Sequence, residues 1–218
     1  MSNGYKSVKW MWPFVFGIII FLAALIAASF FDLPIAMSIT NQGNPFGKIV
    51  QDYGTLPQGA LIVAAVLVLS VPRLRKGYPL LARGMSAMIM QAVLHPLLFC
   101  TSLKFLWGRV RPADMIVKGL EFTPFYIPNP GGGGLSFPSG HVAATLVLLP
   151  VLWLFFKAKR HRAAVPVLLF MTAWAGSVAY GRMLYGAHFL TDVLFSAGTA
   201  FFFVPLSIKA GDWYLARY

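Results

Sequence analysis

Three short segments in the second half of the chain contain residues that could carry out chemistry on phosphate. They read K-x6-R-P at residues 104–112, P-S-G-H at residues 138–141, and R-x5-H-x3-D at residues 182–192. The cations Lys104, Arg111 and Arg182 could hold phosphate oxygens, and arginine can do so through two parallel N–H bonds. Histidine can act as a nucleophile or transfer a proton near neutral pH. Together the segments predict phosphate binding combined with histidine chemistry.

The second and third segments add groups that could orient this chemistry. Ser139 is expected to cap the helix that begins next, and Gly140 allows a ligand to approach the backbone closely. A helix N-terminus at this point would add free N–H groups to an anion site. His188 and Asp192 are four residues apart, which predicts one helix face and a carboxylate that orients the imidazole. His141, His188 and Asp192 are therefore the candidate catalytic residues.

The composition indicates a membrane protein made of helices. The chain has 218 residues, of which 58% are hydrophobic and 11% charged, and its mean hydropathy is +0.72. These values lie outside the range of soluble globular domains. Because backbone polar groups in lipid must be paired internally, we expect an all-α bundle, in one domain over residues 1–218. Six apolar runs could cross the roughly 30 Å of hydrocarbon, at residues 13–31, 56–71, 85–106, 141–156, 164–180 and 189–206.

The basic residues predict how these helices are oriented. The formal net charge is +12, and cytoplasmic segments of membrane proteins are enriched in Lys and Arg. With an inside N-terminus, the inner segments hold twelve of the eighteen basic residues: Lys6, Lys9, Arg73, Arg75, Lys76, Arg83, Lys157, Lys159, Arg160, Arg162, Lys209 and Arg217. This asymmetry predicts cytoplasmic termini and places the three motif segments, and hence the active site, at the outer membrane face. The basic charge therefore reflects topology, and we expect no nucleic-acid partner.

The segments between and before the spans lead to further expectations. Residues 32–55 mix Pro, Gly, Asn and apolar residues, which fits either a short interfacial helix or an ordinary loop.

The long loop at residues 107–137 contains four glycines near its end, at 131–134. We interpret them as a flexible tether, with a surface linker as the alternative. The first apolar run exceeds the usual core of a secretory signal, which favours a retained anchor. With six acidic residues in the chain and no carboxylate cluster, no Mg²⁺ site is expected.

The order and spacing of the three segments resemble the type 2 phosphatidic acid phosphatase family, which shares its site with the vanadium haloperoxidases. The resemblance covers residues 103–194 and points to the bacterial membrane lipid phosphatases within that superfamily. One position departs from the pattern. Many members carry Ser immediately before the arginine of the third segment, where this chain has Gly181. The change removes one hydroxyl donor and none of the charged groups.

The resemblance implies a role for each matching residue. His188 would be the nucleophile that forms a phosphohistidine, Asp192 would orient it, and His141 would protonate the leaving oxygen and later activate water. The phosphoryl oxygens would be held by Lys104, Arg111, Arg182, Ser139 and the Gly140 amide. The resemblance also implies no metal or other cofactor, a bacterial inner-membrane location, and a phosphorylated lipid in the bilayer as the partner.

Three alternative functions are compatible with this fold. A phosphotransferase would pass the phosphoryl group to another lipid, a vanadate-dependent peroxidase would hold vanadate as a cofactor, and a lipid binder or transporter would keep only the fold. Six spans disfavour the peroxidase, whose relatives are typically soluble, and the presence of both His141 and His188 disfavours the binder. The leading hypothesis is a phosphatase acting on a phosphate monoester or diphosphate of an outward-facing lipid. Candidate substrates are lipid A, phosphatidylglycerophosphate, phosphatidic acid and undecaprenyl diphosphate, and the W-G-R-x-R-P form at residues 107–112 slightly favours lipid A.

Overall fold

The computed structural model describes residues 4–217, and it describes side-chain surroundings from residue 15 onward. Every regular element in this part of the chain is a helix. Six helical segments are long and apolar enough to cross a membrane: Val15–Ile39, Pro45–Ser70, Pro79–Lys118, Gly140–Lys157, His161–Leu184 and Leu190–Leu215. The predicted all-α fold with six spanning helices is confirmed, and the protein is a multi-pass membrane protein. The side chains of Lys6 and Lys9, which entered the charge count, lie outside the described residues.

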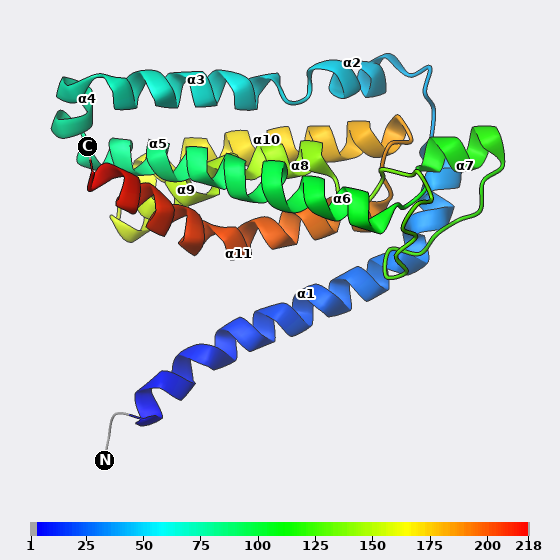
Figure 1. Cartoon of the computed structure of the whole chain (residues 1–218), viewed down its shortest axis with the longest axis horizontal. Helices are drawn as coiled ribbons and strands as arrows, with labels where there is room; N and C mark the ends of the chain where they lie inside the picture. Colours follow the sequence, from blue (N-terminus) through cyan, green and yellow to red (C-terminus); the bar gives the residue numbers. More distant parts are fainter. Residues whose placement is uncertain (1–3, 218) are drawn as a thin grey trace.

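The helices form a bundle whose long axes run roughly side by side (Figure 1). They are α1 (Gly4–Ile39), α2 (Pro45–Tyr53), α3 (Leu56–Ser70), α4 (Pro72–Gly77), α5 (Pro79–Ala92), η1 (Val93–Cys100), α6 (Thr101–Trp107), α7 (Pro112–Lys118), α8 (Gly140–Thr145), η2 (Leu146–Leu148), α9 (Leu149–Lys157), α10 (His161–Leu184) and α11 (Leu190–Leu215). α5 packs against α3, α9 and α11, while α10 packs against α2, α8 and α9. α1 contacts α11, and its N-terminal part diverges from the bundle in Figure 1.

Polar side chains join the helices inside the apolar bundle. Gln91 donates to the carbonyl of Ala200 at 2.9 Å and accepts from the Ser207 hydroxyl at 2.7 Å. The Nε2 atom of His95 lies 3.0 Å from the Thr199 hydroxyl oxygen. Because lipid offers no competing hydrogen bonds, such contacts fix how neighbouring helices are rotated. They set α11, which carries Asp192, relative to α5 and η1.

The third spanning segment changes its winding midway. Residues Val93–Cys100 form a π-helix with Pro96 inside it. Proline lacks the N–H that an α-helix needs and crowds the preceding turn, so the backbone adopts a wider turn there. The helix resumes as α6 and delivers Lys104 to its last turn.

Two helix boundaries differ from the predicted spans in ways that matter for the site. α1 continues to Ile39, which places Asp32 within a helix, and α10 continues to Leu184. Arg182, which the predicted spans left in the connection between residues 180 and 189, therefore belongs to the last turn of α10. Within residues 32–55 the structure has the short helix α2 at Pro45–Tyr53, which belongs to the same candidate span as α3, Pro45–Ser70; its interfacial position stays a prediction.

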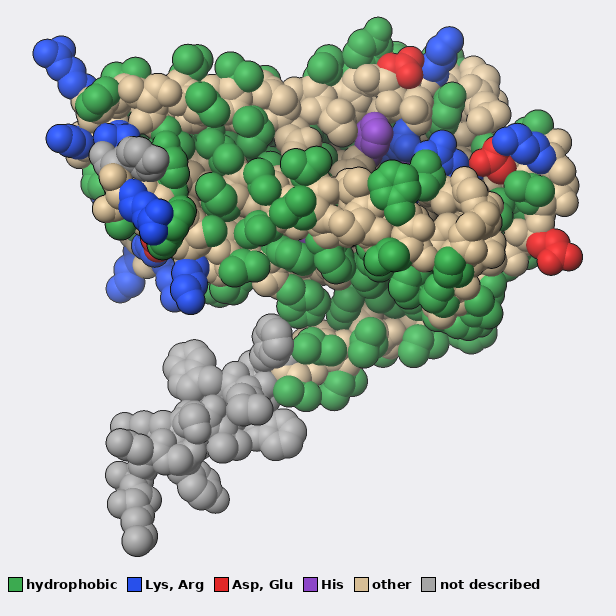
Figure 2. Space-filling view, viewed as in Figure 1, with side chains coloured by type: hydrophobic (Ala, Val, Ile, Leu, Met, Phe, Trp, Pro, Cys, Tyr) green, Lys and Arg blue, Asp and Glu red, His purple; other side chains and the backbone are tan. Residues whose placement is uncertain are grey.

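The charged side chains separate toward the two ends of the bundle. Figure 2 shows Lys and Arg gathered at the left-hand end, where Figure 1 places α4 and the C-terminus, while the middle of this face is hydrophobic or uncharged. Acidic and basic side chains appear together at the opposite end. The uncharged middle fits a membrane-crossing region between two polar ends.

Candidate active site

The three motif segments meet at one end of the bundle, where α6 and α10 end and α8 and α11 begin (Figure 1). Two main-chain bonds join them. Ala113 N, directly after the first segment, donates to the Gly186 carbonyl of the third at 2.8 Å. Ser139 N of the second segment donates to the Asp192 carbonyl of the third at 3.3 Å. The common location predicted for the segments is therefore present in the structure.

His188 lies before the last spanning helix, buried at 1% exposure. Phe189 is the N-cap of α11 and Leu190 its first residue, so the prediction that His188 and Asp192 share one helix face is wrong. The Nδ1 atom of His188 donates to the main-chain carbonyl of Ser136 at 2.6 Å. Because a carbonyl only accepts, the neutral ring carries its proton on Nδ1. The Nε2 atom carries the lone pair and accepts from Nη2 of Arg182 at 3.4 Å.

The protonation of His188 follows from its surroundings. Burial, together with the positive charges of Lys104 and Arg182, lowers the pKa of His188 to about 3, and the Asp192 carboxylate opposes this shift without cancelling it. A histidine with this pKa is neutral at physiological pH. Its Nε2 atom can therefore act as a nucleophile without first losing a proton.

Asp192 sits in the first turn of α11 and reaches His188 less directly than predicted. Its carboxylate lies 3.7 Å from His188 Nδ1, beyond hydrogen-bonding distance. It accepts instead from the Ser136 hydroxyl at 2.5 Å and from Phe189 N at 2.8 Å. Ser136 thus touches both residues, His188 through its carbonyl and Asp192 through its hydroxyl, and the carboxylate orients the imidazole through Ser136.

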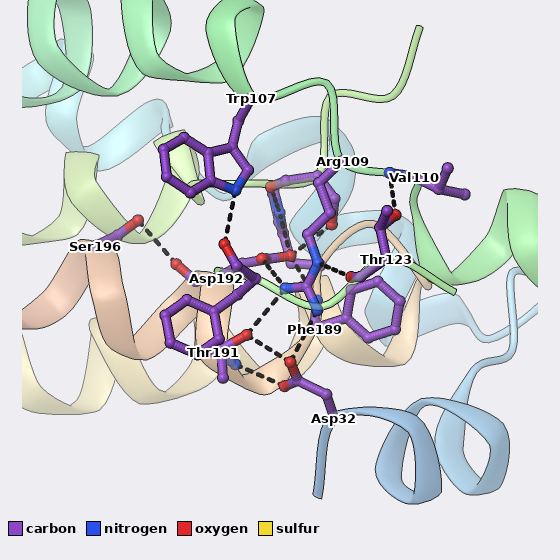
Figure 3. A network of polar contacts seen from close by, with 12 residues as sticks. Asp32, Trp107, Arg109, Val110, Thr123, Phe189, Thr191, Asp192 and Ser196 are labelled. Carbon is purple, nitrogen blue, oxygen red and sulfur yellow. Dashed lines mark hydrogen bonds and ion pairs between the residues drawn. The ribbon is translucent and has the colours of Figure 1, made fainter. Parts of the chain in front are cut away.

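A buried ion-pair network supports this arrangement from the other side (Figure 3). Arg109 is 0% exposed and pairs with Asp192 at 2.5 Å and with Asp32 of α1 at 2.9 Å. It also donates to the hydroxyl of Thr191 at 2.9 Å, and its guanidinium lies 4.2 Å from the centre of the Phe189 ring. Asp32 accepts from Thr191 N at 2.8 Å. Arg109 therefore connects the first helix to the start of the last.

The three predicted phosphate-binding cations have a different environment. None of them forms an ion pair with a carboxylate within residues 15–217. Lys104 donates to the Leu135 carbonyl at 2.8 Å, and the buried Nε atoms of Arg111 and Arg182 have no hydrogen-bond partner. Unpaired cationic N–H groups that are shielded from water lack a partner that an anion would supply.

The second segment completes this end of the bundle. Ser139 caps α8, its hydroxyl accepting from Val142 N at 3.4 Å, as predicted. Gly140 faces open space, with no atom within 4 Å of where a side chain would begin. His141 is half-buried, and its Nε2 atom lies 3.3 Å from the main-chain carbonyl of Gln51. All eight candidate residues therefore occupy the same end of the molecule, and the individual roles assigned to them stay predictions.

Four residues around the site were missed from the sequence: Asp32, Gln51, Arg109 and Ser136. Asp32 gave a signal, because a carboxylate bordering an apolar run is a functional-site candidate by default. Arg109 was visible within the W-G-R-x-R-P form but had no expected partner. Gln51 and Ser136 belong to no motif.

The long loop also differs from the predicted tether. Asn129 N donates to the Trp107 carbonyl at 2.7 Å, and Ser136 N donates to the Arg109 carbonyl at 3.0 Å. A side chain at Gly134 would begin 2.1 Å from the Arg109 carbonyl oxygen. Gly134 therefore allows the loop to pack closely on the Arg109 backbone. This packing places Ser136 beside His188.

Comparison with known families shows which family the chain belongs to. A model of the PAP2 superfamily matches residues 80–214, which include all three motif segments. The chain belongs to the PAP2 superfamily. PAP2 superfamily members are phosphatases, which supports phosphoric ester hydrolysis in general and a lipid substrate in the bilayer. The PAP2 match begins after α3, so Asp32 and Gln51 lie outside it. No curated relative and no solved structure matches the chain.

Within the described part of the chain, no group of three or more His, Cys, Asp or Glu side chains is placed to hold a metal ion. The metal-independent activity expected from the sequence stays a prediction for direct test.

Proposed function

We propose that the protein is a membrane lipid phosphatase that hydrolyses a phosphate monoester or diphosphate through a phosphohistidine intermediate. One observation carries the proposal: three cations without carboxylate partners, Lys104, Arg111 and Arg182, lie at the same end of the bundle as His188, whose neutral Nε2 atom lies 3.4 Å from Arg182. A phosphoryl group bound by these cations would neutralise them, and the histidine would be its nucleophile. Charge neutralisation and positioning supply most of the catalysis in phosphoryl transfer.

The reaction proceeds in two balanced steps. In the first, His188 Nε2 attacks phosphorus, the bond from phosphorus to the lipid oxygen breaks, and a protonated His141 gives that oxygen a proton and becomes neutral. In the second, water attacks the phosphohistidine, the phosphorus–nitrogen bond breaks, and His141 takes up the proton that water releases. The cations hold the phosphoryl oxygens throughout, where developing charge is greatest.

A groove beside the site supports a substrate with a tail in the bilayer. A cavity of about 370 Å³ is lined by Gly140 of the site and by residues of α3 and of the α5–η1 segment. Apolar side chains line much of it, among them Ile62, Ile89, Val93 and Leu97, and Leu97 is 60% exposed on the bundle surface. A hydrocarbon chain could lie in this groove while its phosphate occupies the site. A soluble phosphate ester would need no such groove.

The proposal includes the orientation predicted from charge. Figure 1 places α4 and the α9–α10 connection at the end opposite the site. The exposed basic residues of these segments include Arg73, Lys76, Lys157 and Arg160. A cytoplasmic location for that end would place the site at the outer face of a bacterial inner membrane. A tag fused to the C-terminus should then be accessible only from the cytoplasm. Labelling of the tag from outside intact cells would overturn this orientation.

The enzymatic proposal is tested by phosphate release in detergent with EDTA. The substrates are phosphatidic acid, phosphatidylglycerophosphate, undecaprenyl diphosphate and lipid A, and the comparison is wild type against His188→Ala. His161→Ala is the matched control, because His161 is exposed at the start of α10, at the far end from the site. We expect release from at least one lipid, full activity in the control, and none in His188→Ala.

Other outcomes separate the alternatives. Loss of activity on chelation would refute metal independence while leaving the phosphatase standing. A phosphorylated lipid product without free phosphate would identify a phosphotransferase. Equal release from wild type and His188→Ala would refute the phosphohistidine route.

A further inference from the structure

Helix α2 lies directly against the candidate site, although none of the three motif segments contains it. Ahead of the helix, Asn41 N donates to the Leu184 carbonyl at 2.7 Å, and Asn44 then caps α2. Behind it, Trp174 Nε1 donates to the Gly54 carbonyl at 2.9 Å. Both flanks of α2 are thus bonded to α10, which ends in the site.

A close contact between Val50 and Gly181 sets how deeply α2 sits. Val50 is buried at 6% exposure. A side chain at Gly181 would begin 2.6 Å from a methyl carbon of Val50 and 2.7 Å from its Cβ, which is closer than packed carbon atoms approach. Gly181 is the position that departs from the family pattern, where many members carry Ser. Because Gly181 has no side chain, α2 can pack closely against α10 at this point.

Gln51, the residue after Val50, contacts both Arg182 and His141. The side-chain oxygen of Gln51 accepts from Nη1 of Arg182. Its main-chain carbonyl lies 3.3 Å from Nε2 of His141. Because a carbonyl only accepts, this contact places the proton of a neutral His141 ring on Nε2. Gln51 therefore contacts a predicted phosphate ligand and the predicted acid at once.

The neutral charge of Gln51 matters for anion binding. Arg182 directs Nη1 to Gln51 and Nη2 to His188, while its Nε has no partner. An amide oxygen fixes the direction of the guanidinium and leaves its positive charge available. A carboxylate in the same place would pair with Arg182, cancel that charge and repel an incoming phosphate.

We infer that Gln51 is a positioning residue of the phosphoryl-transfer site, brought there by the packing of Val50 on Gly181. It holds Arg182 beside His188 without neutralising it, and its main-chain carbonyl fixes the ring of His141 through Nε2. Its catalytic consequence rests on the proposed function, whereas its effect on phosphate binding does not. The inference assigns part of the site to residues that lie outside the family match.

The test measures phosphate binding separately from turnover. The full-length protein in detergent is titrated with inorganic phosphate, and binding is followed by the shift in apparent Tm. The variants Gln51→Glu and Gln51→Met match glutamine in size, one adding charge and the other removing the acceptor. We expect phosphate affinity to fall about tenfold or more in Gln51→Glu, on the scale of losing one charge-assisted contact, and less in Gln51→Met. The Tm without phosphate should be unchanged or higher in Gln51→Glu, because it gains an ion pair with Arg182.

These readings distinguish positioning from a structural role. A purely structural residue would lower the Tm without phosphate and leave the affinity of the folded protein unchanged, and that result overturns the inference. Equal phosphate affinity in Gln51→Glu and wild type overturns it as well, as does a wild type that binds no phosphate. A wild type that binds phosphate but releases none from any lipid overturns the proposed function alone.

A second pair of variants tests how α2 is held. Gly181→Ser should lower phosphate affinity and kcat/KM together, because the added side chain displaces Val50 and with it Gln51. Adding Val50→Ala to Gly181→Ser makes room for the serine and should restore most of the loss. Full activity in Gly181→Ser alone, or no recovery in the double variant, contradicts the inferred contact.

Discussion

Arg109 and Arg111 are two residues apart in one segment, yet the structure gives them opposite surroundings. Arg109 is 0% exposed and has two carboxylate partners, Asp32 and Asp192. Arg111 is half-buried, has no carboxylate partner within the described residues, and keeps a buried Nε without a hydrogen bond. A buried cation with its counter-charges holds a fold together, whereas one without them is arranged for an anion that arrives later. The same distinction separates Arg109 from Lys104 and Arg182.

The comparison also reassigns Asp192. In the sequence it is the partner of His188, but in the structure it pairs with Arg109 and accepts from the Ser136 hydroxyl. The carboxylate therefore belongs both to the network that fixes α1 to α11 and to the contacts that orient His188. Replacing Arg109 should consequently lower the stability of the fold, and it should lower catalysis only as a result of that loss.

The largest expected effect comes from breaking the paired network. Arg109→Met leaves Asp32 and Asp192 buried without their cation, which should cost about 3–5 kcal/mol in the free energy of unfolding. Unfolding in detergent, followed by apparent Tm and by retention of a monodisperse peak, measures it. The matched control is Arg83→Met, since Arg83 pairs with Asp212 at 2.6 Å with both side chains at least 40% exposed, and exposed pairs contribute about 1 kcal/mol or less. Equal losses in the two variants would contradict a special role for the buried pair.

The second effect should appear in activity and leave the fold intact. Arg111→Ala removes a cation that has no counter-charge, so kcat/KM should fall about 10²–10³-fold, the scale of one lost transition-state donor. The Tm without phosphate should stay at or above wild type, because repulsion among the cations is relieved. Arg111→Lys keeps the charge but loses the bidentate geometry, so its kcat/KM should lie between those of wild type and Arg111→Ala. A fall below tenfold in Arg111→Ala would show that Arg111 does not hold the phosphoryl group.

The third effect is a dependence of stability on pH that belongs to His188. Its pKa is lowered to about 3 in the folded protein, against about 6.5 in an unfolded chain. Between these values the unfolded chain binds a proton that the folded protein excludes, so stability is lost as pH falls from 6.5 toward 3. At pH 5 the loss is about 2 kcal/mol relative to pH 7.5. The Tm of His188→Gln should therefore change less between pH 7.5 and 5 than that of wild type, and parallel curves would contradict the buried neutral ring.

The sequence predicted the parts of this site that depend on local pattern and missed those that depend on distant contacts. Apolar length revealed six spans, and their order brought the three segments to one end. The four-residue spacing of His188 and Asp192 was misread as one helix face, because Phe189 caps α11 and leaves His188 outside it. Asp32 meets Arg109 across 77 positions of the chain, and Gln51 meets Arg182 across 131. No periodicity or spacing rule in a single sequence encodes such pairings.

The smallest expected effect concerns a third kind of cation near the same end. Lys118, in the last turn of α7, pairs with Asp114 at 2.7 Å, and its side chain is 64% exposed. It resembles Arg109 in having a counter-charge but lacks the burial, so water already screens the pair and its contribution should be about 0.5 kcal/mol or less. Lys118→Ala should therefore leave both the apparent Tm and phosphate release close to wild type, with Asp114→Ala as the reciprocal control. If Lys118→Ala lowered kcat/KM tenfold while Asp114→Ala did not, Lys118 would belong with the anion-binding cations. A counter-charge would then not be enough to mark a cation as structural.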